Sequence, residues 1–238
     1  MRLGLLLVGH VAATSTHLAG DYPELFSSLL DPDVELVRYD LDREHFPDSG
    51  RECDGWMLSP SRCSVYDPHP WIASAEDLLR ELLATERPYV GVCFGHQLVA
   101  QALGAPVARA TDGWQVGVHD YEIVANRPWM VPPRASVALI ASHEDQVLAI
   151  PDGAELLART ERCPIAGLTI GERAWTIQPH PEFGPDLADD LLGRRVELIG
   201  AAKVAAARST LDRPLDRFVV ARWIREFFAT VQMPGRNR

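Results

Sequence analysis

The chain has 238 residues, of which 47% are hydrophobic and 24% charged, and its formal net charge is −10. These values are typical of a globular protein with a sizeable core, and they exclude a disordered or fibrous protein. Because the acidic balance includes arginines scattered among acids, a nucleic-acid partner is not expected. We expect one domain over residues 1–238, with a core at about 1–185 and a helical C-terminal extension at about 186–238.

Apolar runs alternate with helical patterns through the first half of the chain. The predicted elements are, in order, strand Leu3–Val8, helix Tyr22–Leu30, strand Val34–Tyr39, strand Asp54–Leu58, helix Trp71–Thr85, strand Tyr89–Val92 and helix His96–Leu103. Along Trp71–Thr85 the side chains predicted to be buried are Ile72, Leu78, Leu79, Leu82 and Leu83. This order is typical of an α/β fold in which right-handed crossovers give a mostly parallel sheet with helices on both faces.

The pattern changes between Val116 and Ile150, where short runs are separated by turn residues. Tyr121–Val124 and Val137–Ala141 flank a segment with three prolines, Asn126–Arg134, and indicate a small β-rich excursion at the edge of the sheet. Strands are predicted to return at Ala154–Arg159, Ile165–Ile170 and Ala174–Gln178. The tail Asp186–Val231 has a largely helical pattern with a break near Asp212-Arg213-Pro214.

Several kinds of site have no counterpart in the sequence. The four cysteines show neither zinc-type nor paired spacing, and no Gly-x-x-x-x-Gly-Lys loop for nucleotide phosphates is present. No apolar stretch approaches the length of a membrane span, and the run Leu3–Val8 is too short for the core of a secretory signal. We expect a cytoplasmic protein with no metal, no cofactor and no membrane contact.

Cys93 lies in Gly91-Val92-Cys93-Phe94-Gly95, between a predicted strand and a predicted helix. Glycines two positions to either side let the backbone turn sharply, so the side chain between them projects out of the sheet. The helix that follows points its free N–H groups at the sulfur, which favours thiolate over thiol. This is the position of a nucleophile.

A cysteine nucleophile needs a base and a group that orients the base. His180-Pro181-Glu182 offers both, because residues i and i+2 of an extended segment project to the same side and Pro181 stiffens the pair. The segment follows a predicted strand, so it is expected at the carboxyl edge of the sheet beside Cys93.

Other histidines compete for the role of base. His143 also follows a strand-like run and has acidic neighbours, whereas His96 lies one turn into the helix after Cys93 and is expected to face away from the sulfur. The remaining histidines have no cysteine, base or metal arrangement around them: His10, His17, His45, His69 and His119.

Three motifs in this order carry a resemblance to a known family. They are Cys93-Phe94-Gly95-His96-Gln97, Ser142-His143-Glu144-Asp145-Gln146-Val147 and Gln178-Pro179-His180-Pro181-Glu182-Phe183. With them, the stretch from about Val34 to Phe183 resembles the class I (triad) glutamine amidotransferases, and within that family it is most similar to stand-alone members related to the amidotransferase domain of GMP synthase. Ser64-Val65-Tyr66-Asp67 followed by Pro70-Trp71-Ile72 fits the same branch.

The resemblance implies a flavodoxin-like, doubly wound sheet, with Cys93 as nucleophile, His180 as base and Glu182 as its orienting partner. It implies hydrolysis of glutamine through a γ-glutamyl thioester to glutamate and ammonia. The substrate-binding residues that it implies are Gln97, Ser142 and His143.

An oxyanion in such a reaction needs two hydrogen-bond donors, and the backbone N–H of Phe94 is the natural first. For the second, relatives carry a glycine-containing loop where this chain has the segment Ser59–Cys63. Because Pro60 has no N–H, the Ser61 N–H is the expected replacement. Gln115 also differs, since many relatives carry glutamate there.

The sequence leaves three functions open. The first is a glutaminase or amidotransferase that delivers ammonia to a separate synthetase. The second is a γ-glutamyl peptidase or hydrolase, because the acyl-enzyme is the same whichever amine leaves. The third is a catalytically silent regulatory protein, against which the intact Cys93, His180 and Glu182 argue.

Overall fold

The computed structural model describes residues 1–85 and 87–231. The first half of the chain forms β1 (Arg2–Leu7), α1 (Thr16–Ala19), α2 (Tyr22–Ser27), β2 (Glu35–Asp40), the 3₁₀ turn η1 (Leu41–Arg43), β3 (Gly55–Leu58), α3 (Pro70–Ala84), β4 (Tyr89–Val92) and α4 (Phe94–Ala102). The second half forms β5 (Val107–Arg109), β6 (Gln115–Ile123), β7 (Ser136–His143), β8 (Asp145–Val147), β9 (Ala154–Arg159), β10 (Gly167–Ile170), β11 (Ala174–Ile177), α5 (Pro185–Arg194), α6 (Val196–Ile199), α7 (Ala201–Arg208) and α8 (Arg217–Thr230).

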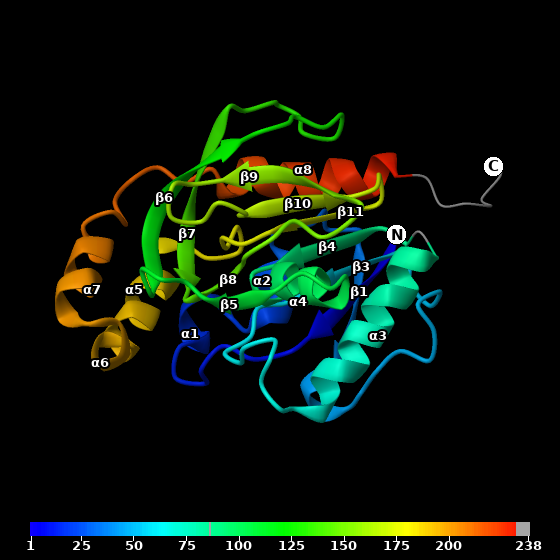
Figure 1. Cartoon of the computed structure of the whole chain (residues 1–238), viewed down its shortest axis with the longest axis horizontal. Coiled ribbons are helices and arrows are strands. Elements are labelled where there is room, and N and C mark those ends of the chain that lie inside the picture. Colours follow the sequence, from blue (N-terminus) through cyan, green and yellow to red (C-terminus); the bar gives the residue numbers. More distant parts are fainter. Residues whose placement is uncertain (86, 232–238) are drawn as a thin grey trace.

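A parallel half of the main sheet positions the two motifs around Cys93 and His180. In the described residues the strand order is β2-β1-β3-β4-β11-β10-β9-β6-β7 (Figure 1). The first five of these strands are parallel neighbours, as predicted. Val92 at the end of β4 pairs with Ile177 at the end of β11. The segments that follow these two residues therefore leave the sheet side by side at its carboxyl edge.

The other half of the sheet is antiparallel, from β11 through β10, β9 and β6 to β7. The sequence predicts a β-rich excursion only between residues 116 and 150, and the β6–β7 hairpin does form at the edge. The antiparallel part extends further because only residues 171–173 join β10 to β11, whereas a parallel connection needs a dozen or more.

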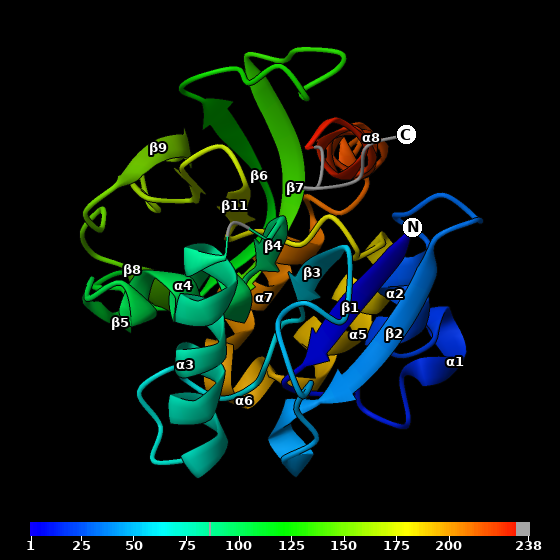
Figure 2. The same cartoon turned by 90° about the vertical axis from the view of Figure 1, so that its right-hand side faces the viewer.

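Helices cover both faces of the sheet, as predicted (Figure 2). Leu3, Leu5 and Leu7 of β1 pack on one side with α2, α5 and α8, while Leu6 packs on the other side with α3 and α4. On α3 the buried side chains are Trp71, Ile72, Ala75, Leu78, Leu79 and Leu82, and Leu83 is half-buried against the same core. Alternate residues of one strand thus enter two separate cores.

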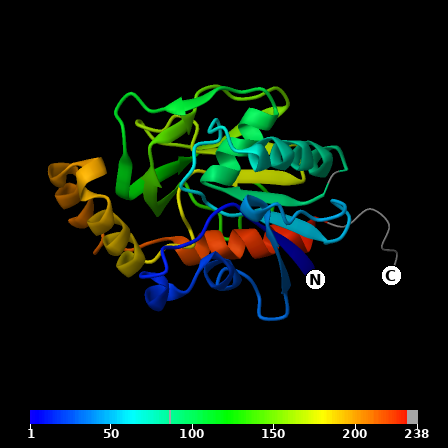
Figure 3. The ribbon, with the colours of Figure 1, turned by 90° about the horizontal axis from the view of Figure 1, so that it is seen from below.

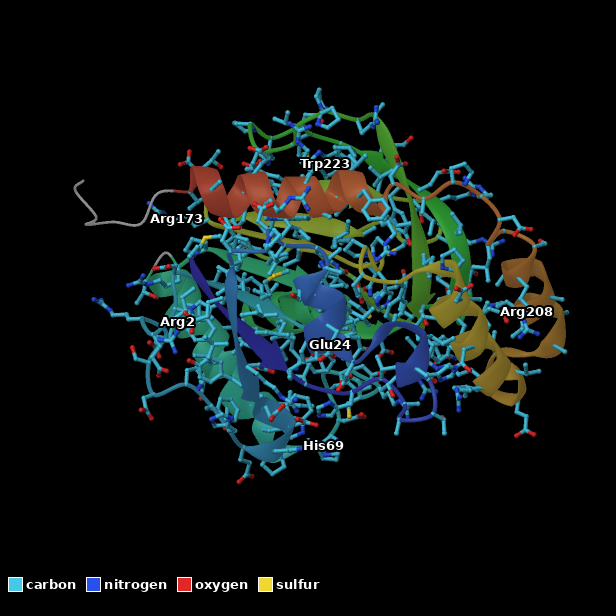
Figure 4. All side chains as sticks on the ribbon, turned by 180° about the vertical axis from the view of Figure 1, so that it is seen from behind. Arg2, Glu24, His69, Arg173, Arg208 and Trp223 are labelled. Carbon is cyan, nitrogen blue, oxygen red and sulfur yellow. The ribbon has the colours of Figure 1, made fainter. Side chains whose placement is uncertain are left out.

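The C-terminal tail is helical, with the predicted break falling between α7 and α8. Helices α5, α6 and α7 lie together at one end of the molecule, and α8 runs back along the sheet (Figure 3). Trp223 of α8 is buried, and its indole N–H donates to the Pro132 carbonyl at 3.0 Å (Figure 4). Residues 232–238 of the expected extension lie outside the described residues.

Strand β7 is the outer strand of the antiparallel half, and other segments occupy its second edge. The Ala138 N–H donates to the Asp216 carboxylate at 2.9 Å, and the Asp216 N–H donates to the Ala138 carbonyl at 2.9 Å. Two residues along, the His180 N–H donates to the Ile140 carbonyl at 2.9 Å. The edge thus holds both the tail and the His180 segment.

No helix in the described part of the chain is long and apolar enough to cross a membrane.

Candidate active site

Cys93 lies at a strained turn between β4 and α4. Its φ is 51° and its ψ −100°, in a region that a residue with a side chain rarely adopts, and such strain is concentrated at functional sites. A Cβ on Gly91 would lie 2.6 Å from the Gly95 carbonyl oxygen, so the first turn of α4 packs directly on β4. The Tyr89 hydroxyl donates to that same oxygen at 3.0 Å. The glycines and Tyr89 hold the turn that presents the sulfur.

The segment after β11 brings His180 and Glu182 together. Nδ1 of His180 lies 2.7 Å from Oε1 of Glu182, and both side chains are buried. The imidazole stacks on Phe183 with ring centroids 4.1 Å apart and an angle of 4° between the rings. From α8, Arg217 donates to the carbonyl oxygens of Pro181 and Glu182 at 3.4 and 3.2 Å. The pair is therefore fixed from several sides.

The second imidazole nitrogen of His180, Nε2, is turned toward the nucleophile's side. Within the described residues it is buried and has no hydrogen-bond partner. His180 and Cys93 line one recess of about 20 Å³. Burial lowers the pKa of His180, but the negative charges of Glu182 and Cys93 outweigh it and raise the pKa to about 10. The surroundings of His180 thus favour the imidazolium.

The competing histidines are placed differently. His96 is buried beneath α4, where Nδ1 lies 2.7 Å from the Thr176 hydroxyl and Nε2 lies 3.1 Å from the Ile165 carbonyl, so it faces away from Cys93 as expected. His143 lies at the end of β7, where Nδ1 is 3.2 Å from the Asp145 carbonyl. Burial and then the charge of His180 lower the pKa of His143 to about 3, which keeps it neutral.

The two expected oxyanion donors lie on opposite sides of the site. Phe94 is the first residue of α4, and the first N–H groups of a helix have no acceptor within it. Ser61 lines the cleft with Cys93, and its N–H has no acceptor among the described residues. Its loop is anchored by Ser59, whose buried hydroxyl accepts from the Val8 N–H at 3.1 Å.

A cleft of about 710 Å³ opens over Cys93. The expected substrate-binding residues all line it: Gln97, Ser142 and His143. The Gln97 amide donates to the Asp145 carbonyl at 2.8 Å and to the Gln178 side chain at 3.0 Å, so its orientation is fixed. Gln115 does not line this cleft, whereas its neighbour Trp114 does.

Sequence reasoning missed two cationic residues of the cleft, Arg62 and Arg195. Arg195 follows α5, in the tail that the sequence describes only as helical, and it donates to the Ser142 hydroxyl at 2.9 Å. Its guanidinium lies 5.4 Å from the centre of the Trp114 ring. A helical pattern does not reveal which arginine turns inward, so the sequence holds no signal for this residue.

Two clusters outside the Cys93 elbow bring three potential metal-ligand atoms within 4.8 Å of one another. They are Cys63, Asp67 and His69, and His10, Asp40 and Asp42. In the second cluster His10 already lies 2.7 Å from the Asp21 carboxylate. The sequence spacing predicts neither cluster, since both depend on how loops fold back.

Known proteins share this combination of sequence and geometry. The family model for glutamine amidotransferase class-I matches residues 27–195. Among curated proteins, γ-glutamyl peptidase 3 of Arabidopsis thaliana is 28% identical over 81% of this chain and 82% of its own length. The glutamine-hydrolyzing GMP synthase polypeptide of Halobacterium salinarum is 29% identical over 73% of this chain and 88% of its own length.

Among solved structures, a glutamine amidotransferase from Thermotoga maritima superposes with a TM-score of 0.75 at 18% identity, covering 95% of this chain and 96% of that one. At this identity the likeness concerns the fold, and it confirms the predicted flavodoxin-like architecture with a helical tail.

Proposed function

This chain belongs to the class-I glutamine amidotransferase family of cysteine-nucleophile amidohydrolases, and from that premise we propose that it hydrolyses γ-glutamyl peptides. The observation that carries this choice is the cleft of about 710 Å³ over Cys93, which has room for more than one amino acid. The likeness to γ-glutamyl peptidase 3 supports the same choice. The order of preference between glutamine and γ-glutamyl peptides from the sequence is thereby reversed.

In the proposed acylation step, the Cys93 thiolate attacks the γ-carbonyl carbon and forms a carbon–sulfur bond. The oxyanion accepts hydrogen bonds from the N–H groups of Phe94 and Ser61. As the carbon–nitrogen bond breaks, the His180 imidazolium gives its proton to the departing amine. Glu182 keeps the imidazole oriented and stabilises its positive charge.

Deacylation reverses these roles. His180, now neutral, removes a proton from water, and the hydroxide adds to the thioester carbonyl. The carbon–sulfur bond then breaks to release glutamate and the Cys93 thiolate. Each proton in the proposed route passes through Nε2 of His180.

A second candidate is a glutaminase that passes ammonia to a separate synthetase. The likeness to the GMP synthase polypeptide of Halobacterium salinarum favours it, since that protein matches this chain over 88% of its own length. In this candidate glutamine fills the γ-glutamyl side of the cleft, and the partner synthetase would dock where ammonia leaves.

The two candidates separate when the purified chain is given equal concentrations of γ-glutamylglycine and glutamine. We expect kcat/KM for the dipeptide to exceed that for glutamine by at least tenfold. Efficient glutamine hydrolysis with negligible dipeptide cleavage would favour the glutaminase. Addition of a synthetase that stimulates glutamine hydrolysis would do the same.

The nucleophile is tested by labelling with a γ-glutamyl chloromethyl ketone. We expect one adduct on Cys93, absent from Cys93→Ala. Cys163→Ala is a matched control, because Cys163 is buried and its thiol pKa is raised to about 12 by burial. Undiminished labelling of Cys93→Ala would refute the assignment.

A further inference from the structure

Arg195 is a half-buried cation whose charge is not balanced by a neighbouring acid. Within residues 1–85 and 87–231 it makes no ion pair, and its hydrogen bond goes to the neutral hydroxyl of Ser142. The Trp114 ring covers one side of the guanidinium. A guanidinium has five N–H donors, and a charge withdrawn from water is costly unless it is paired. The remaining donors of Arg195 border the cleft.

Arg62 adds a second positive charge beside Arg195. It lies on the exposed loop after β3, and its charge reinforces burial in lowering the pKa of Arg195. The other two arginines of the cleft differ, because Arg109 lies 3.5 Å from Glu144 and Arg194 lies 2.6 Å from Asp190. The cleft of this acidic protein therefore contains a local site for an anion.

The position of this anion site relative to Cys93 indicates which part of a substrate it meets. Arg62 and Arg195 line both the large cleft and the small recess that contains Cys93 and His180. Gln97 and Asp145, in contrast, border the large cleft and not that recess. The departing amine takes its proton from His180, so it must lie on the His180 side of the sulfur. The two arginines are thus on the leaving-group side.

We propose that Arg195, assisted by Arg62, binds the carboxylate of the leaving group. The preferred substrates are then γ-glutamyl amino acids and peptides whose released part ends in a free carboxylate. Glutamine releases ammonia and cannot use this site, which gives a physical reason for preferring peptides. This inference rests on the proposed function and names the substrate class within it.

The test compares γ-glutamylglycine with γ-glutamylglycinamide, which differ only in the leaving group's carboxylate. In the wild-type enzyme, we expect KM for the acid to be at least tenfold lower than for the amide, as a charge-assisted pair predicts. Arg195→Met should remove this preference by raising KM for the acid while leaving the amide within about twofold. The control is Arg194→Met, because Arg194 lines the same cleft but is paired with Asp190.

Two outcomes overturn the inference. Equal losses on acid and amide would mean that Arg195 holds the α-carboxylate of the γ-glutamyl group or only supports the fold. Unchanged kinetics on both would mean that Arg195 binds no carboxylate. Circular dichroism melting of Arg195→Met identifies a folding defect.

Binding to the Cys93→Ala variant separates this inference from the proposed function. Calorimetry should show the acid binding at least tenfold more tightly than the amide, with the difference lost when Arg195→Met is added. If this pattern holds but the wild type does not hydrolyse the dipeptide, the proposed function fails and the anion site stands. If neither dipeptide binds, the anion site is refuted.

Discussion

The Nδ1 atom of His180 and the Oε1 atom of Glu182 lie 2.7 Å apart with both side chains buried. Glu182 therefore determines which imidazole nitrogen is available to the substrate, and its charge offsets the burial that would otherwise make His180 neutral. His143 faces the same imidazole and is neutral, because its own pKa is lowered to about 3.

Glu182→Gln tests this relationship. In the wild type we expect kcat/KM to fall as pH rises through about 10, where His180 loses the proton that it gives to the leaving amine. Without the carboxylate, burial dominates, so the alkaline limb should move down by more than about one pH unit, and activity at pH 7 should fall by roughly 100-fold or more. A pH–rate profile with an unmoved alkaline limb would contradict the role of Glu182.

His143 and His180 are predicted to fail in different ways. His180→Ala should abolish turnover, because it removes the proton donor and acceptor. His143→Ala should mainly raise KM, since a neutral histidine at the cleft can bind substrate but is poorly suited to accept a proton. Steady-state kinetics on the two variants check this, and the reverse pattern would exchange their roles.

The Ser61 backbone is tested with a matched pair of variants. Ser61→Pro removes the N–H, and loss of one oxyanion donor should lower kcat by roughly 100-fold. Ser61→Ala retains the N–H and removes only the hydroxyl, which accepts from the Cys63 N–H at 3.2 Å, so kcat should stay within about threefold. A similar kcat for both variants would exclude the Ser61 N–H as donor.

The turn at Cys93 could be predicted from the sequence because local sterics determine it. An apolar strand, two glycines and a helical pattern occur within a few residues, and each restricts the backbone independently of the rest of the fold. The meeting of Cys93 with His180 was also predictable, since both follow strands whose carboxyl ends share one edge.

The rest depends on contacts distant in sequence. The glycines before His119 obscured the start of β6, yet Gly117 adopts a φ of 85° where a Cβ would lie 2.9 Å from Cα of Ala207. That glycine is required by the packing of α7, which the sequence of β6 does not contain. Arg195 is positioned in the same way, through its contacts with Trp114 and Ser142 rather than by any local pattern.

Gly91→Ala should destabilise the protein. The new Cβ would lie 2.6 Å from the Gly95 carbonyl oxygen and 2.7 Å from the Tyr89 hydroxyl, so either β4 or α4 must shift. Overpacking of this kind costs about 1–3 kcal/mol. Urea unfolding measures the change, with Gly193→Ala as control because the nearest atom there is the end of the flexible Arg208 side chain. An equal effect of both substitutions would contradict this account of the turn.

His96 should make the protein sensitive to acid. Burial lowers its pKa to about 4, so between that value and 6.5 the unfolded chain binds more protons than the folded one. The free energy of unfolding should therefore decrease as pH falls through this window, by roughly 3 kcal/mol from this group. His96→Gln cannot titrate, and its urea midpoint should vary less between pH 7 and pH 4. An unchanged pH dependence would place the acid sensitivity elsewhere.

The Asp216–Ala138 pair gives the tail a protective role. Backbone groups on the open side of an outermost strand can recruit a strand from another molecule, which leads to aggregation. Asp216 occupies both polar groups of Ala138 at that side, and the His180 segment occupies the Ile140 carbonyl. A chain shortened before Asp216 would expose β7 to self-association while loosening the support of its own catalytic segment, so solubility and activity would decline together.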